Sequence, residues 1–175
     1  LYSSAASDVY KRQIPYSGMW IVRPIINLEG MGLDASIQHM EAGTKIPQGT
    51  FYSEVFTGRH ITIDYVREGN VWTQTDTFEG FNTPDNLIQF SRWTRVSYPY
   101  HLPMLLRSVE AKHINIETIG GNIIEVHLRG NPDPVMYDDF WPIWSEGQQR
   151  PMEGYVRIAD KEDHIGRLGF FVPVW

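Results

Sequence analysis

Two glutamates flank a pair of glycines in the stretch NIETIGGNIIEVHLRGNPD, residues 115–133. Glu117 precedes the glycines and Glu125 follows them, and both lie in runs that alternate polar and apolar residues as β-strands do. His127 comes two residues after Glu125, so the two side chains share one strand face. Carboxylate oxygens and imidazole nitrogens are common ligands of divalent metal ions. The pattern therefore indicates a metal site if the two strands pair in the right register.

The length of the connecting turn decides that register. A two-residue turn at 120–121 pairs Glu117 with Ile124 and places polar side chains over the core. A three-residue loop at 120–122 pairs Glu117 with Glu125 and keeps the other face apolar, so we expect this longer loop. The same register predicts two further pairs, Asn115 with His127 and His113 with Arg129.

The predicted pairing brings two negative charges together. The Cβ atoms of two directly paired residues lie about 5 Å apart, and like charges at that separation destabilise a sheet. A divalent cation between Glu117 and Glu125 removes the repulsion, and oxygen ligands suit Mg²⁺. The alternative is an ordinary solvated face, on which water and Arg129 or a lysine screen the charges. The residues by themselves leave both interpretations open.

Strand-like runs dominate the rest of the chain. We expect strands over six ranges: 19–26, 50–56, 60–66, 70–78, 154–160 and 167–174. The residues from 50 to 78 are typical of an antiparallel meander.

Helix signals are fewer. Thr83, followed by Pro84 and Asp85, predicts a helix over 83–93. Apolar residues at helical spacing after Pro103 predict a second helix over 102–112.

Four prolines favour a long loop over 131–151, anchored by aromatic residues: Phe140, Trp141 and Trp144. Within it, Asp138 and Asp139 read as solvated loop carboxylates. The fold class expected from these elements is α+β, with a mainly antiparallel sheet and a few short helices.

Composition limits the classes of function. Of the 175 residues, 42% are hydrophobic and 13% aromatic, which is typical of a globular chain. A net charge of −6 without a Lys/Arg block argues against a nucleic-acid partner. No apolar run approaches the roughly 18 residues of a membrane span. The absence of cysteine excludes disulfides, thiolate metal ligands and a catalytic thiol. We expect a soluble, cytoplasmic protein.

The first residues are atypical of a native protein. LYSSAASDVYKRQ, residues 1–13, has no apolar signal core and resembles a translated sequencing adapter. We therefore expect a chain truncated upstream, with residues 14–175 as one domain. A frayed native terminus is the alternative.

Three segments together resemble the ATP-grasp superfamily. WIVRPIINLEGMG is similar to its strand ending in Lys-Pro and the following glycine-rich loop, and SEVFTGRHITIDYV to the connector along the nucleotide cleft. INIETIGGNIIEVHLR resembles the family's metal-binding end. The segments follow the family's order over roughly residues 19–130, and the variant is most similar to small members encoded by bacteriophages. The resemblance implies an ATP-grasp-like fold, located in the host cytoplasm if the chain is phage-encoded.

The resemblance also implies ATP and Mg²⁺ as cofactors. It makes Arg23 the phosphate-binding and catalytic cation, and Arg129 the cation that stabilises an acyl-phosphate. The remaining nucleotide contacts that it implies are the loop residues Gly30, Met31 and Gly32, the connector residues Glu54, Val55 and Phe56, and His60. The metal ligands that it implies are Glu117 and Glu125, with His127, and with Asn131 or a water supplying a further ligand. Without the resemblance, the glycine loop reads as an ordinary turn.

Two positions depart from the family pattern. His60 stands where the family commonly has glutamate, and His127 where it commonly has asparagine. Imidazole suits transition metals better than Mg²⁺. The resemblance predicts a ligase in which Mg-ATP phosphorylates a small carboxylate or peptide and an amine or related nucleophile displaces phosphate. The departures leave two alternatives: a non-catalytic nucleotide-binding or interaction module, and a transition-metal site formed by Glu117, Glu125 and His127.

Overall fold

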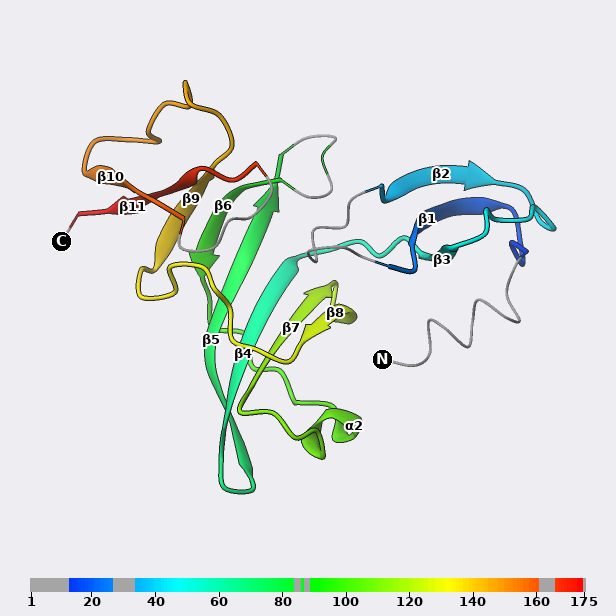
Figure 1. The fold of residues 1–175 in the computed structure, drawn as a ribbon, viewed down its shortest axis with the longest axis horizontal. Coiled ribbons are helices and arrows are strands. Elements are labelled where there is room, and N and C mark those ends of the chain that lie inside the picture. Colours follow the sequence, from blue (N-terminus) through cyan, green and yellow to red (C-terminus); the bar gives the residue numbers. More distant parts are fainter. Residues whose placement is uncertain (1–12, 27–33, 84–85, 87–88, 161–165, 175) are drawn as a thin grey trace. The chain divides into compact units, whose positions relative to one another are not determined.

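A computed structural model describes residues 13–26, 34–83, 86, 89–160 and 166–174. The chain forms two compact units, residues 1–56 and 57–175 (Figure 1). No helix in the described ranges has the length and apolar character required to cross a membrane.

The first unit contains a three-stranded antiparallel sheet in the order β2-β1-β3. Its strands are β1 (Gly18–Pro24), β2 (Ser36–Met40) and β3 (Thr50–Glu54). A small core packs on this sheet, made by Ile14, Trp20, Val22, Met40, Ile46 and Tyr52. Because β3 pairs with β1, the predicted meander over 50–78 is wrong in its first strand.

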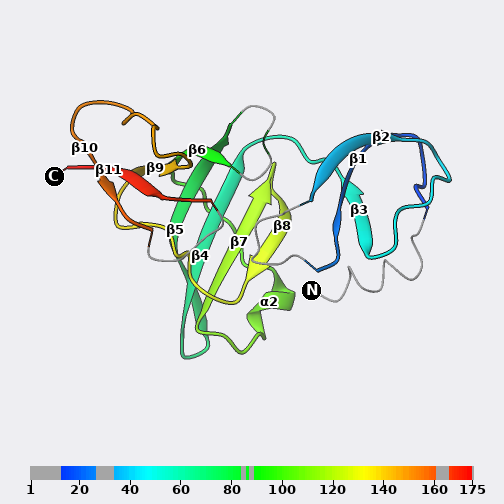
Figure 2. The ribbon, with the colours of Figure 1, turned by 45° about the horizontal axis from the view of Figure 1, so that its top comes forward.

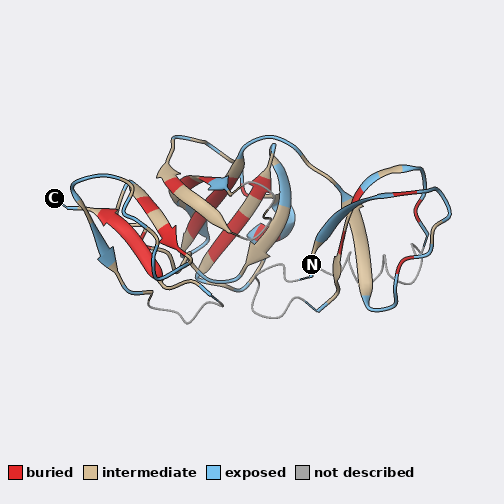
Figure 3. Ribbon diagram, turned by 90° about the horizontal axis from the view of Figure 1, so that it is seen from above, coloured by how far each residue is buried: buried red, intermediate tan, exposed pale blue. Residues whose placement is uncertain are grey.

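The second unit contains an eight-stranded antiparallel sheet in the order β10-β11-β9-β6-β5-β4-β7-β8 (Figure 2). The strands in chain order are β4 (His60–Glu68), β5 (Val71–Asn82), β6 (Phe90–Arg95), β7 (His113–Ile119), β8 (Asn122–His127), β9 (Asp139–Ile143), β10 (Tyr155–Ile158) and β11 (Gly169–Pro173). A two-residue turn, Gly69-Asn70, joins β4 to β5, which pair antiparallel as the predicted meander requires. Next to the C-terminus, β11 is buried from Gly169 to Val172 (Figure 3).

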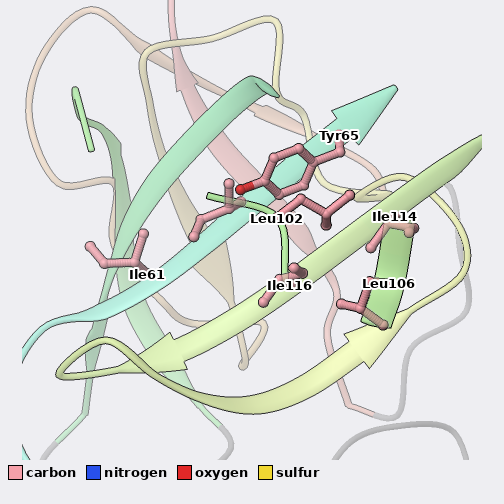
Figure 4. Close-up of a cluster of buried hydrophobic side chains, with 7 residues drawn as sticks. Ile61, Tyr65, Leu102, Leu106, Ile114 and Ile116 are labelled. Carbon is pink, nitrogen blue, oxygen red and sulfur yellow. The ribbon is translucent and has the colours of Figure 1, made fainter. Parts of the chain in front are cut away.

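Both faces of the central strands are covered, and β4 presents apolar side chains to one face and polar side chains to the other. On one face of β4, Ile61, Ile63 and Tyr65 pack with residues of β7 beneath Leu102 and Leu106 (Figure 4). A fully buried isoleucine contributes roughly 1.5–3 kcal/mol to this core. The other face of β4 carries buried polar groups, Thr62 and Asp64. The core on that face lies towards the C-terminal strands and consists of Phe78, Trp93, Phe140, Phe170 and Val172.

The predicted α+β class is wrong, because the described structure is almost entirely sheet with one helix of four residues. That helix, α2 (Met104–Arg107), replaces the predicted helix over 102–112. It buries only Leu106 and has no side-chain cap, so little stabilises a longer helix.

Two other predicted elements are also wrong. The predicted helix over 83–93 is replaced in part by β6, which pairs with both β5 and β9. Pro84 and Asp85, two of its three start signals, lie outside the described residues. The predicted loop over 131–151 contains β9, whose Phe140 is fully buried opposite Trp93. Pairing and burial of aromatic residues outweighed the local helix and loop signals at both places.

Candidate metal centre

Three adjacent strands position the candidate site. β7 lies between β4 and the edge strand β8, so residues of all three strands form rows across the sheet. One row is Thr62, Glu117 and Glu125, and the next is Asp64, Asn115 and His127. These positions share the polar face of the sheet, because they alternate with the isoleucines of the apolar core.

The predicted pairing of Glu117 with Glu125 is confirmed, but the turn that produces it is different. The turn is Gly120-Gly121, and both glycines have positive φ values of 58° and 85°. This two-residue turn would put the glutamates out of register, and a β-bulge next to Glu117 restores it. The predicted three-residue loop is therefore wrong. Asn115 pairs with His127 as predicted, whereas β8 ends at His127 and leaves Arg129 outside the strand.

The side chains of Glu117, Glu125 and His127 converge. His127 Nε2 lies 3.7 Å from Glu125 Oε1 and 3.9 Å from Glu117 Oε1. One ligand atom from each residue falls within 4.8 Å of the other two. A tetrahedral ion with bonds of about 2.1 Å holds its ligand atoms about 3.4 Å apart. Small side-chain rotations therefore bring the three groups to bonding distance, and each is only 20–28% exposed.

A second histidine orients the central carboxylate. His60 Nε2–H donates to Glu117 Oε2 at 3.0 Å, while the other oxygen, Oε1, is the one nearest His127. The His60 ring is held edge-on against Phe90 and Trp93, with ring centroids 4.8 Å and 5.8 Å away. Carboxylates that bind metals are commonly held by such an outer hydrogen bond. His60 thus joins the cluster as a partner of Glu117.

The protonation states suit metal binding. Burial favours the neutral form of Glu117, but the hydrogen bond from His60 and the electrostatic effect of the nearby His60, His127 and Arg129 side chains outweigh it and lower its pKa. Burial is also the main reason why the pKa of His127 is lowered, despite the opposing attraction of Glu117. An ionised carboxylate and a neutral imidazole are the forms that bind metal ions.

Two other predicted site residues, the catalytic cation Arg129 and the metal ligand Asn131, lie in the segment after β8. Arg129 donates to the carbonyl of Gly130 at 3.1 Å, and its charge acts on both Glu117 and His127. The side-chain oxygen of Asn131 accepts a hydrogen bond from the backbone N–H of Asp133 at 3.0 Å. The backbone N–H of Asn131 donates to Asp64 Oδ1. Asn131 is not in the three-residue cluster of ligand atoms.

The predicted nucleotide contacts lie mainly in the first unit. Arg23, on β1, packs over the Phe51 ring at 4.9 Å. Glu54 ends β3 and accepts a hydrogen bond from Tyr16 at 3.0 Å, and Val55 and Phe56 follow it outside any strand. Gly30, Met31 and Gly32 lie outside the described residues.

Sequence reasoning missed a second carboxylate centre. Asp139 accepts four side-chain hydrogen bonds, from Arg92, Thr94, Trp141 and Tyr155. Burial raises the pKa of Asp139, but these four hydrogen bonds have the larger effect, so the pKa lies below its ordinary value. The centre joins β6, β9 and β10 and is structural, which corrects the interpretation of Asp139 as a solvated loop residue. An Asp-x-Trp alternation on a strand was the available signal, hidden by the prolines.

No protein-family model matches this chain, and no curated protein matches it in sequence.

Proposed function

We propose that this protein binds one divalent transition-metal ion, best matched by Zn²⁺, through Glu117, Glu125 and His127. The convergence of one ligand atom from each of these residues within 4.8 Å carries the proposal. This is the transition-metal alternative that the sequence left open.

The ligand types favour zinc over magnesium. One imidazole nitrogen and two carboxylate oxygens form a mixed set that suits Zn²⁺, whereas Mg²⁺ prefers oxygen ligands alone. The hydrogen bond from His60 supports the same conclusion. It occupies Oε2 of Glu117 and leaves Oε1, the oxygen nearest His127, to bind the ion.

Three protein ligands leave one position of a tetrahedral ion open. Such a position takes water or a substrate atom, and zinc lowers the pKa of bound water to about 7. The chemistry that this arrangement supports is activation of water or polarisation of a bound oxygen.

Calorimetric titration of the metal-free full chain tests the proposal. We expect one Zn²⁺ per chain, with Mg²⁺ binding far more weakly. Glu117→Gln, Glu125→Gln and His127→Ala should each abolish or greatly weaken binding, and His60→Gln should weaken it roughly 10–100-fold. Glu153→Gln is the matched control, since Glu153 is exposed and makes no hydrogen bond or ion pair within the described structure. Zinc binding that survives all three ligand substitutions contradicts the site.

The ATP-dependent ligase stays a prediction. Its implied contacts Arg23, Glu54, Val55 and Phe56 belong to the first unit, and its metal ligands to the second. The α+β fold expected with it is wrong, and the non-catalytic nucleotide-binding module stays a prediction in the same way.

A further inference from the structure

The second unit contains a cavity that the metal centre does not use. Its volume is about 490 Å³, within the range of small-molecule sites. Aromatic side chains of β4, β5 and the segment before α2 line it: Tyr65, Trp72 and Tyr100. The cavity lies on the apolar face of the sheet, which also carries Leu102, whereas the metal centre lies on the polar face.

Hydrogen bonds hold the aromatic walls in place. Trp72 Nε1 donates to the carbonyl of Arg107 at 3.2 Å, and Arg67 covers the Trp72 ring with its guanidinium carbon 5.8 Å from the centroid. The Tyr65 hydroxyl donates to the carbonyl of Tyr100, and the Tyr100 hydroxyl donates to the carbonyl of Gly121 at 3.2 Å. Rings fixed in this way lose little freedom when a ligand stacks on them.

Gln74 completes the fixed wall. Its amide group donates to the Thr77 hydroxyl and the Tyr98 carbonyl, and its oxygen accepts from the Tyr100 N–H. These three bonds occupy its side chain, so Gln74 contributes rigidity to the cavity and no spare donor for a ligand.

Three other lining residues keep polar groups available. Within the described structure, Asn70 and His101 make no side-chain hydrogen bond, and Arg107 uses only Nε, which donates to Leu102 at 3.1 Å. The two terminal nitrogens of Arg107 therefore remain available as donors, and no carboxylate in the described structure lies within ion-pair distance of them. A planar guanidinium with two free –NH₂ groups matches a carboxylate in bidentate geometry.

We propose that this cavity binds a small aromatic carboxylate. Its ring lies between the walls formed by Trp72 and Tyr100, and its carboxylate pairs with Arg107 at the rim. The rigid aromatic walls select a planar ligand, and the unpaired positive charge selects an anion. Asn70 and His101 line the same cavity, and in this proposal they donate the remaining hydrogen bonds to the carboxylate.

Calorimetry with 2-naphthoate, using 2-naphthylmethanol as its uncharged counterpart, tests this site on the full chain. We expect naphthoate to bind with a Kd of about 1 mM or tighter and the alcohol to bind about tenfold more weakly. Arg107→Gln should raise the Kd for naphthoate about tenfold or more. Arg150→Gln, the same change at an exposed arginine outside the cavity, should leave it unchanged.

Nuclear magnetic resonance on the unsubstituted protein gives a second measurement that does not depend on how Arg107→Gln folds. Naphthoate should shift the indole N–H signal of Trp72 and the amide signal of His101, and leave that of Phe140, in the other core, in place. Equal affinity for the alcohol, an unchanged Kd in a folded Arg107→Gln variant, or no signal change at Trp72 each overturns the proposal.

Discussion

Asp64 is a buried carboxylate, and its burial makes a quantitative prediction about stability. It lies on β4 with 7% of its surface exposed. Its Oδ1 accepts from the backbone N–H of Asn131 at 2.9 Å and from the Asn115 side chain at 3.2 Å. Its Oδ2 is buried and has no hydrogen-bond donor within the described structure. Burial raises the pKa of Asp64 from 3.8 to about 6, although the two hydrogen bonds oppose the change.

The raised pKa means that the folded protein binds the Asp64 proton more tightly than the unfolded chain does. The resulting stability is fully present below about pH 3.8 and is lost as the pH rises towards 6. For these two pKa values, the loss between pH 4 and pH 7 amounts to about 2.5 kcal/mol. Asp64→Asn has no titrating group there. The stability of Asp64→Asn relative to the unsubstituted protein should therefore rise by about 2.5 kcal/mol from pH 4 to pH 7.

Urea denaturation of both proteins at pH 4, 5, 6 and 7, with chelator present, measures this difference. The amide of Asn changes the free energy of unfolding by an amount that does not depend on pH. Comparing the difference between the two proteins at several pH values removes that constant amount. Glu153→Gln, at an exposed position, should show no comparable trend. A difference that is flat, or that falls as the pH rises, would mean that Asp64 does not have the raised pKa that its burial implies.

Three further predictions concern the core, the metal centre and the ligase. Gly80→Ala should lower the free energy of unfolding by roughly 1–3 kcal/mol in urea denaturation. The added Cβ would lie 2.6 Å from Trp93 and 2.8 Å from Phe90, whereas Gly147→Ala, with nothing within 4 Å, should change little; equal effects would contradict this. Because the pKa of His127 is lowered, zinc affinity should be constant from pH 8 to 7 and fall only below about pH 6.5 in calorimetric titrations; affinity that already falls between pH 8 and 7 would contradict the neutral imidazole inferred for His127. If the ligase prediction is right, Mg-ATP should raise the melting temperature of the chain, and no shift at millimolar nucleotide would count against it.

Alternation of polar and apolar residues was enough to predict much of the central sheet. Ile61, Ile63 and Tyr65 occupy alternate positions of the strand predicted over 60–66 and share a buried face, and Glu117 pairs with Glu125 as predicted. Both results follow from one constraint, since a strand with one apolar face has a single register that buries it. The bulge next to Glu117 is how the structure meets that constraint with a two-residue turn.

The errors arose where distant partners decide the local structure. Phe90–Arg95 becomes a strand because β5 and β9 pair on either side of it, and β9 is distant in sequence. Pro142 sits within β9 despite its missing N–H. The hydrogen bond from His60 to Glu117 joins residues 57 positions apart, and Asp139 gathers partners from β6 and β10. Short-range patterns carry no information about such contacts.

Anomalous diffraction at the zinc absorption edge, on crystals of the full chain soaked in zinc, shows whether Glu117, Glu125 and His127 bind the ion. We predict a single strong peak bonded to one oxygen of Glu117, one oxygen of Glu125 and Nε2 of His127, at about 2.0–2.2 Å. Absence of a peak between these side chains, or zinc bound only at other residues, would contradict the account.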